Sequence, residues 1–218
     1  HSDAPGPRPG GVPFSAVGPA SSGEAIGGVM RPGEPRRLVI LAEGQLGPHS
    51  AKTAFGVIRY GRDEVVAVLD STNAGRNISA WLPGHDIPVV ATLGDALALA
   101  SPRRPDALLV GIAPTGGRLP DAWRGVLRGA LDAGLELHSG LHTFLGDDPE
   151  LSAAAAIDGV RIVDYRRPPE RFETAVGRRH RPGSRVILMV GTDCSVGKMS
   201  VALELRDAGR AAGDSVAF

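Results

Sequence analysis

Short apolar runs alternate with amphipathic stretches along most of this chain. The runs are six to nine residues long and rich in Val, Leu and Ile, with turn-forming residues on either side. Continuous apolar runs of this kind are typical of strands that helices cover on both faces. The pattern predicts six such strands, at 38–44, 64–70, 87–92, 106–114, 135–140 and 160–165.

The stretches between these runs predict helices. Residues 50–61 carry apolar side chains at helical spacing and end at Gly61, a residue type favoured where helices end. Further helices are predicted at 94–101, 121–134 and 148–156. Strands that alternate with helices through short connections form right-handed crossovers and a parallel sheet. Residues 37–166 are therefore predicted to form a Rossmann-like α/β domain with a doubly wound parallel sheet.

The two ends of the chain differ from this middle part. Residues 1–36 are rich in Gly, Pro, Ser and Ala without apolar periodicity, which predicts a flexible leader. Residues 167–184, rich in Arg and Pro, are predicted to be a linker. A second unit then begins, and its expected elements are a strand at 186–190, a helix at 198–212 and the start of a strand at 214–218. Three elements cannot bury one another, so 185–218 is interpreted as the beginning of a truncated P-loop domain, and the chain as a fragment of a longer protein.

Residues 185–200 combine an apolar run, a polar loop and the start of a helix. This is the layout of a phosphate-binding loop, in which main-chain N–H groups, the helix dipole and a lysine converge on one anion. Glycines at both ends of the loop permit a tight turn and the close approach of an anion to the backbone. The residues expected to hold a diphosphate are Gly191, Thr192, Cys194, Ser195, Val196, Gly197, Lys198, Met199 and Ser200.

The loop departs from the commonest P-loop in two respects. Five residues, not four, separate Gly191 from Gly197, a spacing similar to that of the dethiobiotin synthetase-like ATPases. Met199 follows Lys198, where most P-loops carry a Ser or Thr whose hydroxyl ligates Mg²⁺, and a thioether is a poor ligand for this hard cation. Ser200 lies one position further on, rotated by about 100° around the helix. The loop is therefore expected to bind a diphosphate without Mg-dependent hydrolysis.

Small and polar residues follow four of the predicted strands. In parallel sheets, ligands bind at the carboxyl ends of strands near a switch in strand order, so these loops are candidates for substrate binding. Asp70 has two interpretations, a ligand for a hydroxyl or amine group or a cap of the following turn. The double glycine at 116–117 either presents amides to a carboxylate or forms a tight turn. The candidate substrate-binding residues are Asp70, Ser71, Thr72, Gly75, Pro114, Gly116, Gly117, Ser139 and Gly140.

Three residues are candidates for a catalytic role. His142 is a candidate acid or base because histidine titrates near neutral pH, and the alternative is a structural histidine beside a turn. Asp193 lies in the phosphate loop, where it hydrogen-bonds either the loop or a substrate amine. Lys198 is expected on phosphate. His138 lies on an apolar run and is expected to be a hydrogen-bonded core residue, and no spacing of His and Cys predicts a metal site.

Composition narrows the classes of function. The chain has 218 residues with 24 basic and 24 acidic side chains, a balance that argues against nucleic acid or a membrane surface as the main partner. The single cysteine, Cys194, excludes a disulfide within this chain and is typical of the reducing cytoplasm. No apolar stretch reaches membrane-spanning length. The sequence thus predicts a cytoplasmic protein that acts on a small molecule.

Five motifs together resemble one family. They are AVLDST-AG at 67–75, VGIAP-GG at 110–117, SGLHTFLGDDPEL at 139–151, GVRIVDYRRPP at 159–169 and VGTDCSVGKMS-ALEL at 190–205. In this order and spacing they resemble the family known as domain of unknown function 1611, whose members include a D-glutamate N-acetyltransferase. The resemblance extends from about residue 37 to the end of the chain, and it implies a Rossmann-like domain followed by a P-loop domain.

The resemblance implies acetyl transfer from acetyl-CoA to the amine of an amino acid such as D-glutamate. A P-loop can hold the diphosphate of coenzyme A without hydrolysing it, so no Mg²⁺ ligand is needed after Lys198. Asp193 or His142 is then expected to take the amine proton, and amides at 111–117 to hold the carboxylate. Two alternatives stay open, an enzyme that uses ATP with Mg²⁺ and a non-catalytic nucleotide-binding or CoA-binding module. An unpaired sheet edge also makes a homo-oligomer a possible assembly.

Overall fold

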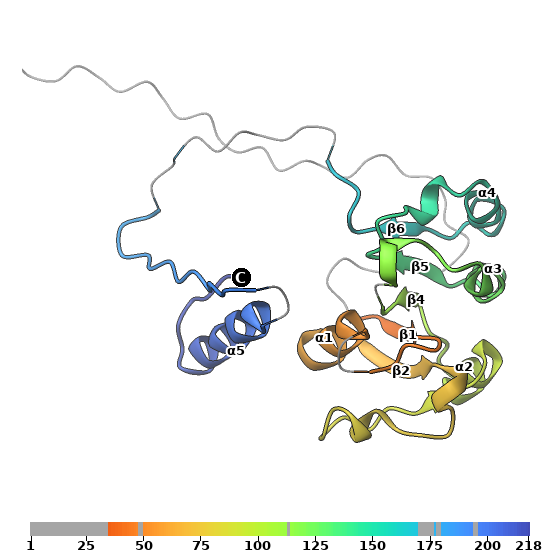
Figure 1. The fold of residues 1–218 in the computed structure, drawn as a ribbon, viewed down its shortest axis with the longest axis horizontal. Coiled ribbons are helices and arrows are strands. Elements are labelled where there is room, and N and C mark those ends of the chain that lie inside the picture. Colours follow the sequence, from red (N-terminus) through yellow and green to blue (C-terminus); the bar gives the residue numbers. More distant parts are fainter. Residues whose placement is uncertain (1–34, 48–49, 113, 170–176, 178–179, 194–195) are drawn as a thin grey trace, which may run out of the picture. The chain divides into compact units, whose positions relative to one another are not determined.

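One parallel sheet forms the centre of the fold (Figure 1). The computed structural model describes residues 35–47, 50–112, 114–169, 177, 180–193 and 196–218. The strands in these residues are β1 (Arg37–Leu41), β2 (Glu64–Leu69), β3 (Val89–Val90), β4 (Ala107–Val110), β5 (Glu136–Ser139) and β6 (Ile162–Asp164). All neighbouring pairs are parallel, in the order β3-β2-β1-β4-β5-β6. The predicted doubly wound parallel sheet is confirmed, with its switch in strand order between β1 and β4.

The helices in the described part of the chain are α1 (Lys52–Tyr60), α2 (Leu93–Leu99), α3 (Arg124–Asp132), α4 (Pro149–Asp158) and α5 (Lys198–Ala211). Helices α1 to α4 connect strands and cover the two faces of the sheet, and α5 follows the last strand. Figure 1 shows α1 on one face of the sheet and α2, α3 and α4 on the other. Right-handed crossovers require helices on both faces, because the chain moves across the sheet in one direction from β1 to β2 and in the opposite direction from β4 to β6.

Apolar side chains of the strands and the helices meet in one core. Val39, Leu108 and Leu137 in the strands are fully buried, as are Ala54 in α1 and Leu127 in α3. Each large apolar side chain buried in this way stabilises the fold by about 1.5–3 kcal/mol relative to an exposed position. The apolar runs of the sequence therefore become strands that are covered on both faces, as their pattern predicts.

Local capping determines where two of the helices begin. Thr92 and Asp95 form a capping box at the start of α2, in which each side chain accepts a hydrogen bond from the main-chain N–H of the other. Asp148 caps α4 by accepting from Glu150 and Leu151 N–H groups, with proline at the first helical position. These caps shift the helix starts by about one residue from the apolar pattern.

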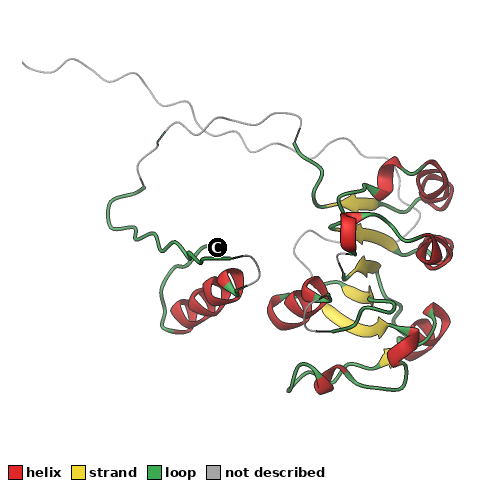
Figure 2. Ribbon diagram, viewed as in Figure 1, coloured by secondary structure: helices red, strands yellow, loops and turns green. Residues whose placement is uncertain are grey.

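Residues 186–190 do not form the strand that their apolar pattern predicts. The segment is irregular loop (Figure 2), and the side chains of Val186, Ile187, Leu188 and Val190 are between 65% and 79% exposed. A strand needs a hydrogen-bonded neighbour, and no described residue pairs with this run. The predicted strand start at 214–218 is wrong for the same reason, whereas the helix between the two runs forms as predicted.

Parts of two predicted segments lie outside the described residues. The described part of the predicted leader is 35–36, and the described parts of the predicted linker are 167–169, 177 and 180–184. Their boundaries stay predictions. Within the described residues, every helix is too short or too polar to cross a membrane.

Candidate functional site

The buried carboxylate of Asp70 joins the loops that follow β1 and β2. It is fully buried and accepts five hydrogen bonds. The donors are the N–H groups of Gly44, Leu46 and Thr72, the Thr72 hydroxyl and the Asn73 amide, at 2.6–3.2 Å. Burial alone would raise the pKa of Asp70, but these hydrogen bonds outweigh burial and lower it. The capping interaction expected of Asp70 is therefore present, and substrate binding by this residue stays a prediction.

The turn after Asp70 lies where three strands end. The main-chain N–H and the hydroxyl of Ser71 both donate to the carboxylate of Glu43, which follows β1. Gly75 has a φ of +83°, and its N–H donates to the carbonyl of Val89 in β3 at 2.9 Å. Ser71, Thr72 and Gly75 are exposed, so this turn is accessible to a ligand at the carboxyl edge of the sheet.

The loop after β4 meets the loop after β5 at Gly117 and His142. Gly117 has a φ of +66°, and a Cβ at this position would lie only 2.6 Å from Cδ2 of His142. The N–H of Thr143 donates to the Gly117 carbonyl at 3.3 Å. In the same turn Pro114 is buried and Gly116 is exposed. The structure thus brings the predicted carboxylate-binding turn into contact with the predicted base, and the His142 side chain is exposed.

Ser139 and Gly140 shape the end of β5. The Ser139 hydroxyl accepts a hydrogen bond from the N–H of Leu141 at 3.1 Å, and the residue is 1% exposed. The Gly140 carbonyl accepts from Nε of Arg166 at 2.6 Å. Both contacts order the turn that carries His142, and a contact of either residue with substrate stays a prediction.

α5 begins at the glycine–lysine motif, as predicted. Gly197 is the N-cap with a φ of +89°, and among the described residues no side chain caps the first turn. The N–H groups of Lys198, Met199 and Ser200 belong to the first turn, which an α-helix leaves without intrahelical partners. The positive end of the helix dipole lies at the same place. This helix start therefore has the features of an anion-binding site.

The phosphate loop folds back on itself in front of this helix start. A Cβ at Gly191 would lie 2.8 Å from Cγ2 of Val196 and 3.3 Å from Cδ of Lys198, so the main chain passes close to these two side chains. Nζ of Lys198 donates to the main-chain carbonyl of Asp193. The exposed members of the loop include Thr192, Asp193 and Val196. Its members outside the described residues are Cys194 and Ser195.

The start of α5 opens onto a cavity of about 520 Å³, which we term the loop cavity. Its other walls come from α1 and from the turn at 81–82. The cavity combines cationic side chains with aromatic ones, which are Lys52, Arg59, Lys198, Phe55, Tyr60 and Trp81. Positive charge suits phosphate groups, and aromatic faces suit a nucleobase. The loop cavity therefore has the chemistry of a nucleotide-like ligand site.

A hydrogen bond joins α5 to α1, and one apolar side chain of α5 is buried. The Tyr60 hydroxyl donates to Oε1 of Glu204 at 2.8 Å, and Leu203 is only 8% exposed. The turn that closes the cavity is also fixed, because the guanidinium carbon of Arg76 lies 4.4 Å from the ring centroid of Trp81. α5 is therefore connected to α1 by a specific side-chain hydrogen bond.

Sequence reasoning missed the residues that α1 contributes to this cavity. Lys52, Phe55 and Arg59 are spaced by three and four positions, so they share one face of α1. Their spacing in the sequence indicates a helix face with cationic and aromatic side chains. Nothing in the sequence pattern connected this face with the phosphate loop, which lies far away along the chain.

The strand order and the helix start at the glycine–lysine motif define a class of protein, a Rossmann-like domain followed by a P-loop segment. Two models of one family match these two parts. The domain of unknown function DUF1611_N, a Rossmann-like domain, matches residues 71–168, and DUF1611_C, a P-loop domain, matches residues 173–218. The chain belongs to the DUF1611 family, as its motifs predict.

Relatives of this chain include two proteins named for an activity. A D-glutamate N-acetyltransferase of Tritonibacter scottomollicae is 36% identical over 156 residues, which are 72% of this chain and 43% of that protein. A protein of the same name from a Pseudoalteromonas species is 38% identical over 46% of this chain and 30% of that protein. The crystal structure of a DUF1611 family protein from Anabaena variabilis is 34% identical with a TM-score of 0.71, over 82% of this chain and 51% of that chain. The chain thus spans less than half of the length of the two D-glutamate N-acetyltransferases.

Proposed function

We propose that the intact protein containing this chain transfers the acetyl group of acetyl-CoA to the amine of an amino acid such as D-glutamate. The start of α5 carries the proposal, because its N–H groups and Lys198 open onto the loop cavity while Met199 stands where a Mg²⁺ ligand is usual. Such a site suits a diphosphate that is bound and not hydrolysed. The name shared by two relatives supports acetyl transfer to D-glutamate.

The side chains of the loop cavity fit the chemistry of coenzyme A. Its diphosphate would be held by the N–H groups of 198–200 and by the Lys198 ammonium, with Arg59 adding positive charge. The aromatic side chains of the same cavity would contact the adenine. When bound, acetyl-CoA supplies an acetyl group that is activated as a thioester.

The remaining predicted site residues have roles toward the amino acid. Its amine must lose a proton as the nitrogen forms a bond to the acetyl carbon. His142, exposed beside Gly117, is one candidate for the base, and Asp193 in the phosphate loop is the other. Within the segment 111–117, the N–H groups of Thr115 and Gly116 are candidates for holding the carboxylate, because Pro114 has no N–H and the N–H of Gly117 donates to the Pro114 carbonyl at 2.8 Å. As the C–N bond forms, the C–S bond breaks and coenzyme A leaves as a thiol, which takes up a proton.

One observation supports ATP with Mg²⁺ as an alternative ligand. Ser200 lines the loop cavity together with Lys198, so a hydroxyl is present on the ligand side of α5 although Met199 lacks one. A Mg-dependent ATPase would need this hydroxyl as a metal ligand. The acetyltransferase would not need it. The two functions therefore differ in their dependence on Ser200.

Parallel assays on the intact protein test the proposal. Acetyl-CoA is supplied with a panel of D- and L-amino acids while thiol release is measured, and ATP with Mg²⁺ is supplied while phosphate release is measured. We expect thiol release with an acidic D-amino acid, and roughly a 10- to 100-fold lower kcat/KM in Lys198→Ala, because a charge-assisted phosphate contact is lost. Ser200→Ala should change kcat/KM little.

Arg104→Ala is the control for these variants, since Arg104 is exposed and does not line the loop cavity. It should leave thiol release unchanged. Phosphate release that disappears in Ser200→Ala, with no thiol release for any amino acid, would overturn acetyl transfer and establish the ATPase.

A further inference from the structure

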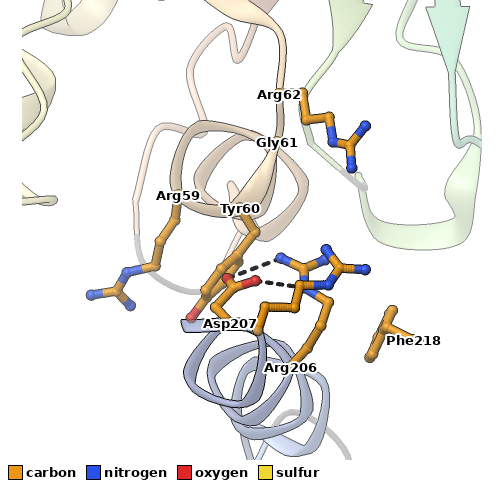
Figure 3. Close-up of a pocket in the computed structure, with 8 residues that line it drawn as sticks. Arg59, Tyr60, Gly61, Arg62, Arg206, Asp207 and Phe218 are labelled. Atoms are coloured by element: carbon orange, nitrogen blue, oxygen red, sulfur yellow. Dashed lines mark hydrogen bonds and ion pairs between the residues drawn. The ribbon is translucent and has the colours of Figure 1, made fainter. Parts of the chain in front are cut away.

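A second cavity, of about 440 Å³, shares Arg59 and Tyr60 with the loop cavity (Figure 3). We term it the arginine cavity, because four arginines and one acidic side chain line it. Its charged lining residues are Arg59, Arg62, Arg206, Arg210 and Asp207. Four positive charges and one negative charge leave a net charge of +3 on these side chains. An excess of positive charge around one hollow favours the binding of an anion there.

The two arginines of α5 are held in place and still have donors for a ligand. Arg206 donates through Nε and Nη2 to Asp207 at 2.7 and 2.9 Å. Arg210 donates through Nε and Nη2 to the carbonyl of Val216 at 3.1 and 2.9 Å. A guanidinium carries five N–H groups, so each arginine uses only part of its capacity in these contacts. The contacts therefore position the guanidinium groups without saturating them.

The other two arginines come from the end of α1 and the turn that follows it. The guanidinium carbon of Arg59 lies 5.9 Å from the ring centroid of Tyr60. Arg62 lies two positions beyond α1 and is exposed. In Figure 3, Arg62 stands on the segment that follows α1, and Arg206 stands on α5. Like charges that line one cavity from two elements repel, and a bound anion offsets that repulsion.

We infer that the arginine cavity binds the 3′-phosphate of coenzyme A. The inference rests on the proposed function, because it takes coenzyme A as the ligand of the loop cavity. Coenzyme A carries two separate anionic groups, a diphosphate and a phosphate monoester on the 3′ oxygen of its ribose. The two cavities are likewise two cationic sites that share a wall, formed by Arg59 and Tyr60. A phosphate monoester carries nearly two negative charges at neutral pH, and the planar guanidinium matches its oxygens.

This assignment makes the arginine cavity a determinant of specificity. ATP and ADP have a diphosphate and an adenine but no 3′-phosphate, so they can use the loop cavity alone. Coenzyme A can use both cavities at once. The arginine cavity thus favours coenzyme A over the adenine nucleotides that a P-loop otherwise accepts.

The test compares the binding of coenzyme A and 3′-dephospho-coenzyme A to the intact protein, measured by calorimetry without an acceptor amino acid. The two ligands differ only in the 3′-phosphate. We expect coenzyme A to bind roughly 10- to 100-fold more tightly. Arg62→Gln should weaken coenzyme A about tenfold without changing the affinity for the dephospho ligand. Arg62→Lys should recover part of that loss, because it restores the charge without the planar fork.

Two further variants test whether the loss of affinity comes from the arginine cavity. Arg104→Gln removes an equal charge at an exposed position that does not line the cavity and should change neither affinity. Lys198→Ala should weaken both ligands equally, because both carry the diphosphate. Equal affinity of the unmodified protein for the two ligands would overturn the inference and leave acetyl transfer standing, as would equal weakening of both by Arg62→Gln. If neither ligand binds while ATP with Mg²⁺ does, the proposed function itself is overturned.

Discussion

His138 is a buried histidine in β5 with polar partners on both ring nitrogens. It is 2% exposed, its Nδ1 lies 2.7 Å from the Tyr165 hydroxyl, and its Nε2 lies 3.1 Å from Oε2 of Glu136. Nη1 of Arg36 lies 3.2 Å from Nδ1. Burial lowers the pKa of His138 and the charge of Arg36 lowers it further, while the hydrogen bond with Glu136 offsets only part of this. The folded protein therefore favours the neutral imidazole.

The free energy of unfolding should decrease as the pH falls below 6.5, the ordinary pKa of histidine. Below this pH the unfolded chain binds a proton at this histidine more readily than the folded protein does, so acid favours unfolding. Above it both states are neutral and the stabilisation is fully present. Urea unfolding between about pH 7.5 and pH 5.5 measures the slope. His138→Gln should make the free energy of unfolding less dependent on pH. The control His180→Gln, at an exposed histidine, should leave the dependence unchanged. A dependence in His138→Gln as steep as in the unmodified protein would contradict the role of His138.

Single residues were predictable from the sequence where the environment is local. The position of His138 on an apolar run predicted a hydrogen-bonded core residue, and this is confirmed. The turn contacts of Asp70 with the residues directly after it follow from its place at a strand end. Arg36, by contrast, lies 102 positions from His138, and only the assembled sheet brings the two together. Contacts of this kind cannot be derived from spacing along the chain.

α1 approaches β4 closely at Gly111, and this approach places the cationic face of the helix. A Cβ at Gly111 would lie 2.2 Å from Cγ2 of Ile40 and 2.9 Å from Cβ of Ala54. The Ala54 N–H also donates to the Gly111 carbonyl at 2.7 Å. The helix that carries Lys52 and Arg59 is therefore held against the sheet at a distance that only glycine permits.

Gly111→Ala should destabilise the fold by about 3 kcal/mol, because the new methyl group overlaps a strand and a helix that are both fixed. Denaturant unfolding of the two proteins measures the difference. Gly125→Ala, inside α3 with no atom within 4 Å of the added Cβ, is the matched control. It should be neutral or stabilising by up to about 1 kcal/mol, since alanine favours the helix. Unchanged stability in Gly111→Ala would mean that α1 does not need this close approach.

The elements themselves were largely predictable, because their signals are periodic and local. All six strands of the sheet and each predicted helix form, with ends that differ from the apolar runs by a few residues. The predicted strands at 186–190 and 214–218 are the exceptions, and both lack a neighbouring strand among the described residues. Residues 186–190 have the composition of a buried strand, but a strand depends on a neighbour, and the sequence of the run cannot show whether one is available.

The distribution of charge in the folded chain differs from what its composition indicates. The formal net charge is zero, with 24 basic and 24 acidic side chains. The lining of the loop cavity nevertheless includes three cationic and three aromatic side chains, and four arginines line the arginine cavity. These groups gather only when α5 packs beside α1. The start of α5 at the glycine–lysine motif was therefore predictable from the sequence, whereas the two cavities around it were not.

Because the positive charge is local, salt should weaken ligand binding without weakening the fold. Raising the NaCl concentration from about 0.05 M to about 0.5 M shortens the Debye length below the distance across a cavity. Coenzyme A should then lose more affinity than 3′-dephospho-coenzyme A, because only coenzyme A adds a dianionic phosphate among the arginines. The melting temperature of the ligand-free protein should change little, since its exposed ion pairs contribute about 0–1 kcal/mol each. Titration calorimetry at each salt concentration measures how the affinity for each ligand depends on salt. An equal salt dependence for the two ligands would show that the 3′-phosphate stays in solvent and not among the arginines.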